Sequence, residues 1–233
     1  MSNEAYIQSR LLTELGGAKG ASKAYTHQFL TDAYRNLRCT NSSRQCGNAC
    51  VPQSKKCRQN VEGLVEKIED KIKSLDYERV VVVTSNGKIP LVKGGGRSEV
   101  GFTEDEFKLF KGNIVTHNHP NLGWRQNDPR AKGLSFSPAD LQAACVGEVR
   151  ELRAVTRDYR HSLKPPPGGW NEKYWKESVE PAYRYHQRQV YQELSNKLFW
   201  GRINRADAEA VFPHEVMKRT AAQAGFHYAR SEY

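Results

Sequence analysis

One stretch limits the possible folds of this chain more than any other: ERVVVVTSNGKIPLV, residues 78–92. It contains four consecutive valines followed by an Asn-Gly pair. β-Branched residues favour strands, and Asn-Gly is typical of the turn between two antiparallel strands. The stretch therefore predicts a β-hairpin. Just before it, residues 59–75 have the period of an amphipathic helix, with the following apolar residues on one face: Val61, Leu64, Val65, Ile68 and Ile72. A helix followed at once by a hairpin indicates a mixed fold.

Patterns typical of helices and of strands continue to alternate along the chain. Thr103 followed by Glu106 is the pattern of a capping box, which predicts a short helix. Ser137 followed by Pro138 predicts the start of another helix. Apolar runs predict strands over residues 112–120, 150–156 and 159–166. We therefore predict an α+β fold.

Changes in composition divide the chain into segments. After a break at PPPGGW, residues 165–170, the pattern is largely helical and is rich in basic and aromatic residues. We expect an N-terminal helical segment over 1–38, a cysteine-rich module over 39–58, a mixed core over 59–165 and a helical extension over 166–233.

The charge balance favours some partners over others. The formal net charge is +10, from 36 Lys and Arg against 26 Asp and Glu. Such an excess favours anionic partners such as nucleic acid or an acidic protein face, although a solvated basic surface gives the same count. No apolar run approaches the roughly 20 residues that span a bilayer, and the first residues do not resemble a secretory signal. We expect no membrane span and a cytoplasmic protein.

The cysteines are concentrated in one short segment. Cys39, Cys46, Cys50 and Cys57 follow the spacing C-x6-C-x3-C-x6-C. In a reducing compartment, clustered thiolates suggest a structural zinc site. In an oxidised or virion context they suggest two disulfides, whose pairing the spacing does not give. Both interpretations stay open, whereas Cys145 stands apart and is expected to be buried on a helix.

Two histidines, in the sequence THNHP, stand one residue apart at the end of the strand predicted over 112–120. Side chains alternate along a strand, so His117 and His119 face the same side and could hold one metal ion. Asp140, in the first turn of the helix that starts after Ser137, is the nearest candidate for a third ligand. Three protein ligands and an open fourth position are typical of a hydrolytic zinc ion.

A hydrolytic metal site also needs a general base and a donor that stabilises developing charge. Glu78 stands immediately before the valine strand, where its carboxylate could reach a metal-bound water. Weaker alternatives for the base are Glu99, Glu104 and Glu106. Ser137, one turn before Asp140, could donate a hydrogen bond to the oxyanion. Glu78 and Ser137 are therefore the candidate catalytic residues.

Taken in order, Glu78, the strand with its Asn-Gly turn, THNHP and Ser137-x-x-Asp140 resemble the JAMM motif of the JAB/MPN metallopeptidases. The spacing after Glu78 is similar to that of the RadC-like branch. The segments THNHP, FSPADL and ELRAVT, with the later GGW, most closely resemble JAB-like domains of Mu-F-like phage head morphogenesis proteins. The resemblance is strong over residues 78–170.

This resemblance implies a curved mixed sheet flanked by helices, related to cytidine deaminases. The helical segments expected at the two ends of the chain would be additions to that fold. It implies a catalytic zinc ion bound by His117, His119 and Asp140. Glu78 would activate water, and Ser137 would contact the oxyanion. The implied reaction is cleavage of a peptide or isopeptide bond in a protein or peptide, by a phage-encoded or phage-derived protein acting in the host cytoplasm or in the virion.

The segment between His119 and Ser137 is longer than in typical JAMM domains. Residues 120–136 include the stretch NLGWRQNDPRAKG, whose glycine, proline and arginine residues indicate a surface loop. Such a loop beside the metal could act as a lid, a substrate clamp or a steric block.

A second, non-enzymatic hypothesis is a module that binds nucleic acid or phage capsid protein through the basic cysteine segment and the C-terminal helices. Recurrent aromatic residues are found in those helices: Tyr174, Trp175, Tyr183, Tyr185, Tyr191, Phe199 and Trp200. We expect them to pack helices, because stacking on bases requires rings exposed beside Lys and Arg. Histidines without metal-like spacing are expected at the surface or at interfaces: His161, His186, His214 and His227.

Overall fold

The computed structural model describes residues 40–46, 49–54, 60–97, 99–121, 123–125, 127–132 and 134–233. The chain divides into two compact units, one of residues 1–64 with 85–88 and one of residues 65–84 with 89–233. The predicted helical segment over 1–38 lies outside the described residues.

The first unit contains a small hairpin. Strands β1 (Ser43–Cys46) and β2 (Ala49–Pro52) pair antiparallel, with Cys46 opposite Ala49 and Gln45 opposite Cys50. Cys39 and Cys57 lie outside the described residues, and only the backbone of Cys46 and Cys50 is described. The zinc and disulfide interpretations of this segment therefore both stay predictions.

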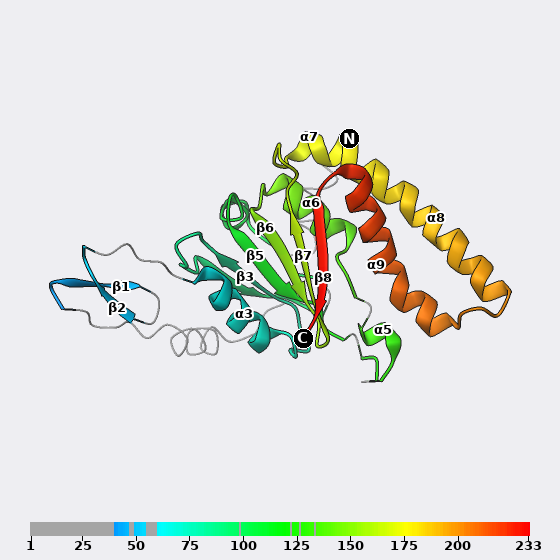
Figure 1. Ribbon diagram of the computed structural model, residues 1–233, viewed down its shortest axis with the longest axis horizontal. Helices are drawn as coiled ribbons and strands as arrows, with labels where there is room; N and C mark the ends of the chain where they lie inside the picture. The colour runs from blue at the N-terminus through cyan, green and yellow to red at the C-terminus, as the bar shows by residue number, and fades with distance from the viewer. Residues whose placement is uncertain are drawn as a thin grey trace. The chain divides into compact units, whose positions relative to one another are not determined.

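The second unit is built on a six-stranded mixed sheet in the order β4-β3-β5-β6-β7-β8 (Figure 1). Its strands are β3 (Arg79–Val83), β4 (Leu91–Gly94), β5 (Ile114–Asn118), β6 (Glu151–Val155), β7 (Tyr159–Lys164) and β8 (His227–Glu232). The pair β5-β6 is parallel, and the other pairs are antiparallel. Helices cover both faces of this sheet, so the predicted α+β class is confirmed.

The valine hairpin forms as its sequence predicts. Strands β3 and β4 pair antiparallel, with Val82 opposite Leu91, and the connection between them contains Gly87 in the left-handed region at φ 75°. Val80 and Val82 point into the main core, whereas Val81 and Val83 face the opposite side of the sheet. Both faces of this strand are buried, which explains the uninterrupted run of valines.

The predicted amphipathic helix is α3 (Val61–Ile72), which covers one face of the sheet. It packs with Val65, Ile68 and Ile72 buried, and it also buries the charged residue Glu69 completely. Thr116 on β5 donates a hydrogen bond of 3.1 Å to Glu69. Ion pairs of 3.7 and 3.3 Å also join Glu69 to Arg153 and Arg160. A buried carboxylate needs such partners, so apolar packing and an ion cluster together hold α3 on the sheet.

Further helices surround the sheet: α4 (Glu104–Lys108), α5 (Pro129–Lys132), α6 (Pro138–Val146), α7 (Glu172–Tyr174), the π-helical segment η2 (Trp175–Val179), α8 (Glu180–Phe199) and α9 (Arg205–Ala224). The capping box predicted at Thr103 and Glu106 is present at the start of α4. None of the helices in the described part of the chain is long and apolar enough to cross a membrane.

The C-terminal helices belong to the same core as the sheet. Residues of α6, η2, α8 and α9 pack with Val80, Val115 and Leu163 in one cluster. The prediction that residues 166–233 are helical is wrong at their end, because residues 227–232 form β8 and pair with β7 along its whole length. This strand completes the sheet, so the C-terminal segment is part of the mixed core.

Candidate metal centre

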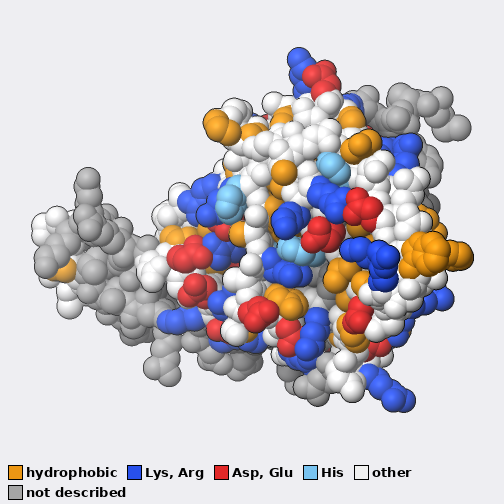
Figure 2. Space-filling view, turned by 45° about the vertical axis from the view of Figure 1, so that its right-hand side comes forward, with side chains coloured by type: hydrophobic (Ala, Val, Ile, Leu, Met, Phe, Trp, Pro, Cys, Tyr) orange, Lys and Arg blue, Asp and Glu red, His pale blue; other side chains and the backbone are white. Residues whose placement is uncertain are grey.

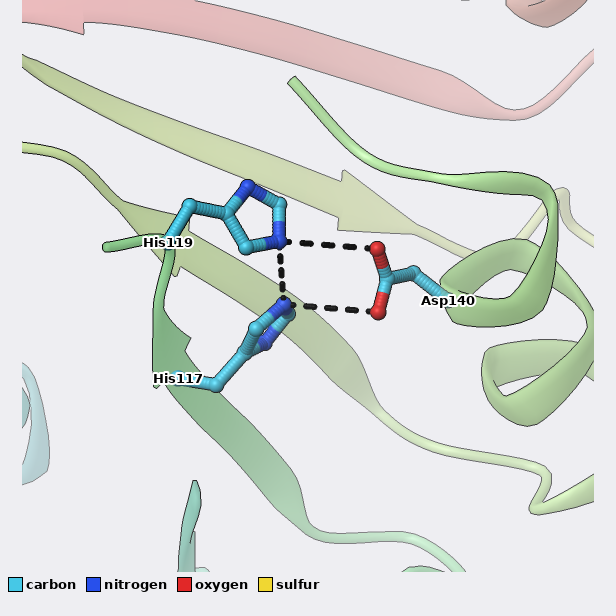
Figure 3. A group of neighbouring side chains, drawn as sticks. All are labelled: His117, His119 and Asp140. Carbon is cyan, nitrogen blue, oxygen red and sulfur yellow. Dashed lines mark hydrogen bonds and ion pairs between the residues drawn. The ribbon is translucent and has the colours of Figure 1, made fainter. Parts of the chain in front are cut away.

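Strand β5 brings the two histidines of THNHP together. Val115 and His117 face the main core, and the backbone N–H of His119 continues the pairing by donating to the carbonyl of Val155 at 2.8 Å. His117 is 3% exposed and His119 is partly exposed. Their Nε2 atoms lie 2.9 Å apart (Figure 3). The two imidazoles therefore direct one nitrogen each toward a common point.

Helix α6 supplies the third group. Ser137 caps this helix, and its backbone N–H and hydroxyl donate to Oδ2 of Asp140 at 2.7 and 2.8 Å. This capping box holds the carboxylate toward the histidines. Oδ1 of Asp140 lies 3.4 Å from Nε2 of His117, and Oδ2 lies 3.6 Å from Nε2 of His119.

The donor set fits a metal ion. His117, His119 and Asp140 are the described residues whose ligand atoms lie within 4.8 Å of one another in such a group. Ligands at about 2.0–2.1 Å from a tetrahedral zinc ion lie about 3.3 Å from one another, close to the 2.9–3.6 Å found here. Two imidazoles and one carboxylate leave one tetrahedral position for water or substrate.

The pKa values of Asp140 and His117 depend on each other's charge. Burial alone would raise the pKa of Asp140, but the charges and hydrogen bonds of His117 and His119 hold it well below its usual range. Burial alone would lower the pKa of His117, but Asp140 raises it above its ordinary value, assisted by a hydrogen bond to the backbone of Arg153. A second hydrogen bond of this kind orients metal-binding histidines in many proteins.

Glu78 lies on the same side of the sheet as the histidines. Val80 pairs with His117, so Glu78, two residues earlier, faces the same way, and it is 8% exposed. Burial raises its pKa, while the charges of His117 and His119 act to lower it and that of Asp140 to raise it. The residue predicted as the base is thus a buried carboxyl group that interacts electrostatically with all three candidate ligands.

The backbone of Glu78 is fixed by the segment that follows β4. On the β4 side, its N–H donates to Gly96 at 2.8 Å and its carbonyl accepts from Gly95 at 2.9 Å. A Cβ atom at Gly95 would meet the carbonyl oxygen of Glu99 at 2.0 Å, so this position requires glycine. The alternative base Glu106 is occupied elsewhere, since its carboxylate pairs with Lys93 and caps α4.

Asn118, the middle residue of HNH, has a structural role that the sequence reasoning missed. Its fully buried side chain points away from the two histidines, accepts a hydrogen bond of 2.7 Å from the N–H of Arg79 and donates one of 3.0 Å to the carbonyl of Tyr77. It therefore joins the strand that carries the histidines to the segment that carries Glu78. A polar residue between two ligands on a buried strand is the signal that could have revealed it.

Ser137 contacts Asp140 and is exposed. Its hydroxyl donates to Oδ2 of Asp140 and accepts from the backbone N–H of Asp140 at 3.2 Å. To act on an oxyanion, the hydroxyl would have to redirect its proton from Asp140. The helix-capping role is therefore established, and the oxyanion role stays a prediction.

A polar cluster lies beside the metal group. The hydroxyl of Tyr228 on β8 lies 3.1 Å from Oγ of Ser135, 3.1 Å from Nδ1 of His161 and 2.8 Å from Nδ1 of His214. The expectation that His161 lies at the surface or at an interface is wrong, because it is 1% exposed within the core of this chain and burial lowers its pKa to about 3. It is therefore neutral at physiological pH.

Phe136 connects this cluster to the ligands. Its buried ring lies between His117 and His161, with ring centroids 6.2 and 6.1 Å away. Ser135 and Phe136 directly precede the capped turn that holds Asp140. Because Tyr228 contacts Ser135, it anchors the start of that turn. Strand β8 therefore stabilises the position of Asp140 without contributing a ligand itself.

The long segment 120–136 is attached to α9. Arg130 makes two hydrogen bonds of 2.9 and 2.7 Å to the carboxylate of Asp128 and an ion pair of 3.4 Å with Glu209 of α9. The ring of Trp124 lies against the guanidinium of Arg130 at 3.5 Å from its centroid. These contacts join Trp124 and Asp128 to Arg130 and join Arg130 to α9, while residues 122, 126 and 133 lie outside the described part of the chain.

No family model matches this chain, and neither a curated protein nor a solved structure matches it. The resemblance to the JAMM motif therefore stays a prediction that rests on the residues themselves.

Proposed function

We propose that this protein is a zinc-dependent metallopeptidase or isopeptidase of the JAMM type. The observation that carries the proposal is the convergence of His117, His119 and Asp140 on one point beside the buried carboxyl group of Glu78. A structural zinc site normally uses four protein ligands, whereas three ligands with an acid nearby are typical of catalysis.

The residues have distinct roles in this proposal. His117, His119 and Asp140 would hold a zinc ion, which lowers the pKa of a bound water and polarises the scissile carbonyl. Glu78 accepts a proton from the attacking water as its oxygen bonds to the carbonyl carbon. Glu78 then delivers that proton to the leaving amine as the C–N bond breaks. Ser137 donates a hydrogen bond to the oxyanion during the attack.

The resemblance to JAB-like domains of phage head morphogenesis proteins supports a protein or peptide substrate in a phage-related setting. The anchored segment 120–136 lies between the second histidine and the capped helix, so it is placed to influence how a substrate chain enters. The proposal is restricted to the class of bond that is cleaved.

Metal dependence of hydrolysis tests the proposal. Pools of fluorogenic peptides and isopeptide-linked substrates are incubated with the full chain before and after treatment with a chelator. We expect hydrolysis to stop after chelation and to return with Zn²⁺ but not with Mg²⁺, which prefers oxygen ligands. Hydrolysis that continues without metal would contradict the proposal, as would a zinc-loaded chain that cleaves none of the substrates.

A further inference from the structure

The outer side of α8 carries exposed aromatic rings. Tyr185 is 54% exposed, Tyr191 66%, Phe199 80% and Trp200 69%. The expectation that the C-terminal aromatic residues pack helices is confirmed for the buried Trp175 and Tyr183, but it is wrong for these four. Figure 2, in which the side of the molecule that holds α8 and α9 is turned forward, shows hydrophobic and basic side chains next to each other at the surface.

Basic residues accompany these rings. From Pro181 to Arg205 the sequence contains Arg184, Arg188, Lys197, Arg202 and Arg205, and its one acidic residue is Glu193. Glu193 is neutralised by two hydrogen bonds of 2.7 and 2.8 Å from Arg219 of α9. Arg184 pairs with Glu180 at the start of α8. Arg188 and Arg202 have no ion pair within the described part of the chain.

The rings and cations share one side of the helix. The inner side of α8 buries Ala182, Tyr183, Val190 and Leu194 against the core. At about 100° per residue, the opposite side presents Arg184, Tyr185, Arg188, Tyr191, Gln192 and Phe199. We call this side, together with Trp200, the α8 face. An open groove lined by Pro181, Tyr185 and Arg188, among others, lies at its beginning.

We propose that the α8 face binds single-stranded nucleic acid. Exposed rings offer stacking platforms for unpaired bases, and interleaved arginines contact the phosphates. Tyr185 and Phe199 are 14 residues apart, which is about 20 Å along the helix and suits a strand of roughly four to six nucleotides. This function goes beyond the proposed hydrolysis and does not depend on it.

The arrangement fits a nucleic acid better than a lipid surface. A helix that lies on a membrane presents a continuous apolar side and keeps its cations on the other. Here the continuous apolar side faces the core, and the outer side alternates rings with Arg188 and Gln192. A duplex is also a poor fit, because its paired bases do not expose their faces to aromatic side chains.

Fluorescence anisotropy of labelled oligothymidylate and oligouridylate, each of about 16 nucleotides, tests this proposal with the full chain over a range of salt concentrations. We expect salt-sensitive binding. Tyr191→Ala and Phe199→Ala should each weaken it about fivefold or more, because each removes a stacking platform. Arg188→Ala should reduce the slope of log K against log salt by about 0.7, the value for one phosphate contact with a single strand.

Lys67→Ala is the matched control, because it removes one exposed positive charge from α3 on the opposite face of the sheet. It should leave affinity and salt slope unchanged, and circular dichroism should show that all variants are folded. The proposal is overturned if neither oligonucleotide binds at low salt, or if the α8 variants bind as the wild type does. Preferential binding to phosphatidylserine vesicles or to polyglutamate would also overturn it. Oligonucleotide binding should persist after metal is removed with a chelator. The outcome is therefore independent of whether the metallopeptidase proposal holds.

Discussion

Glu78→Gln is expected to lower the rate of hydrolysis by about 10²–10⁴-fold while zinc remains bound. The substitution keeps the size of the side chain and removes the group that accepts the proton of the attacking water. The candidate ligands come from β5, the residue after it and α6, so their positions do not depend on the charge of Glu78. Measurements of kcat, zinc content and the thermal midpoint on the same preparation separate loss of the base from loss of the metal.

Glu99→Gln is the matched control for this substitution. Glu99 is exposed, and its charge raises the pKa of Glu78, so it is the alternative base that interacts with the same site. We expect Glu99→Gln to remain active. If Glu99→Gln abolished hydrolysis and Glu78→Gln retained it, the assignment of the base would be wrong, although the metal site would stand.

Asn118→Ala is expected to reduce both stability and activity without releasing the metal. The substitution removes the side-chain partner of the N–H of Arg79 and of the carbonyl of Tyr77, two hydrogen bonds that are partly buried. A buried group left unpaired costs about 1–3 kcal/mol, so for this partly buried pair the free energy of unfolding should fall by about 2 kcal/mol. Because the segment that carries Glu78 loses its attachment, we expect a fall of about 10–100-fold in the rate of hydrolysis.

Asn113→Ala provides the comparison at the other end of the same strand. Asn113 donates a hydrogen bond of 2.8 Å to the carbonyl of Leu109. It directly precedes Ile114, which pairs with Val83 at the end of β3 that is farther from Glu78. We expect it to lower the free energy of unfolding without a comparable effect on kcat. Equal losses of activity in both variants, measured by denaturant titration and a hydrolysis assay, would show that Asn118 acts through stability alone.

Local patterns predict how each member of the candidate ligand group is oriented, but not that the three members meet. The alternation of side chains places His117 and His119 together on any strand, and the Ser137 capping box fixes where Asp140 points. Both are properties of a few neighbouring residues. The meeting of β5 with α6 was inferred from the chemistry of the residues rather than from any local rule, and the structure confirms it.

Other features depend on contacts between distant segments, which local patterns do not encode. β8 has a polar sequence, HYARSE, because it is an edge strand, so neither alternation nor apolar content marked it. Glu69 lies within an amphipathic helix, and its burial follows from the partners Thr116 and Arg153, which are distant in sequence. His161 is an exception, since alternation with Leu163 on β7 could have predicted its burial.

Metal content per chain tests the central claim most directly. Chains are loaded with zinc, dialysed and analysed by elemental analysis as wild type, His117→Ala and His119→Ala, with His227→Ala as a control at an exposed histidine of β8. The structure predicts that His117→Ala and His119→Ala each remove one zinc ion and that His227→Ala removes none. Any zinc bound by the cysteine segment would remain in all four proteins. Zinc content that is the same in His117→Ala as in the wild type would contradict the metal centre and with it the proposed hydrolysis.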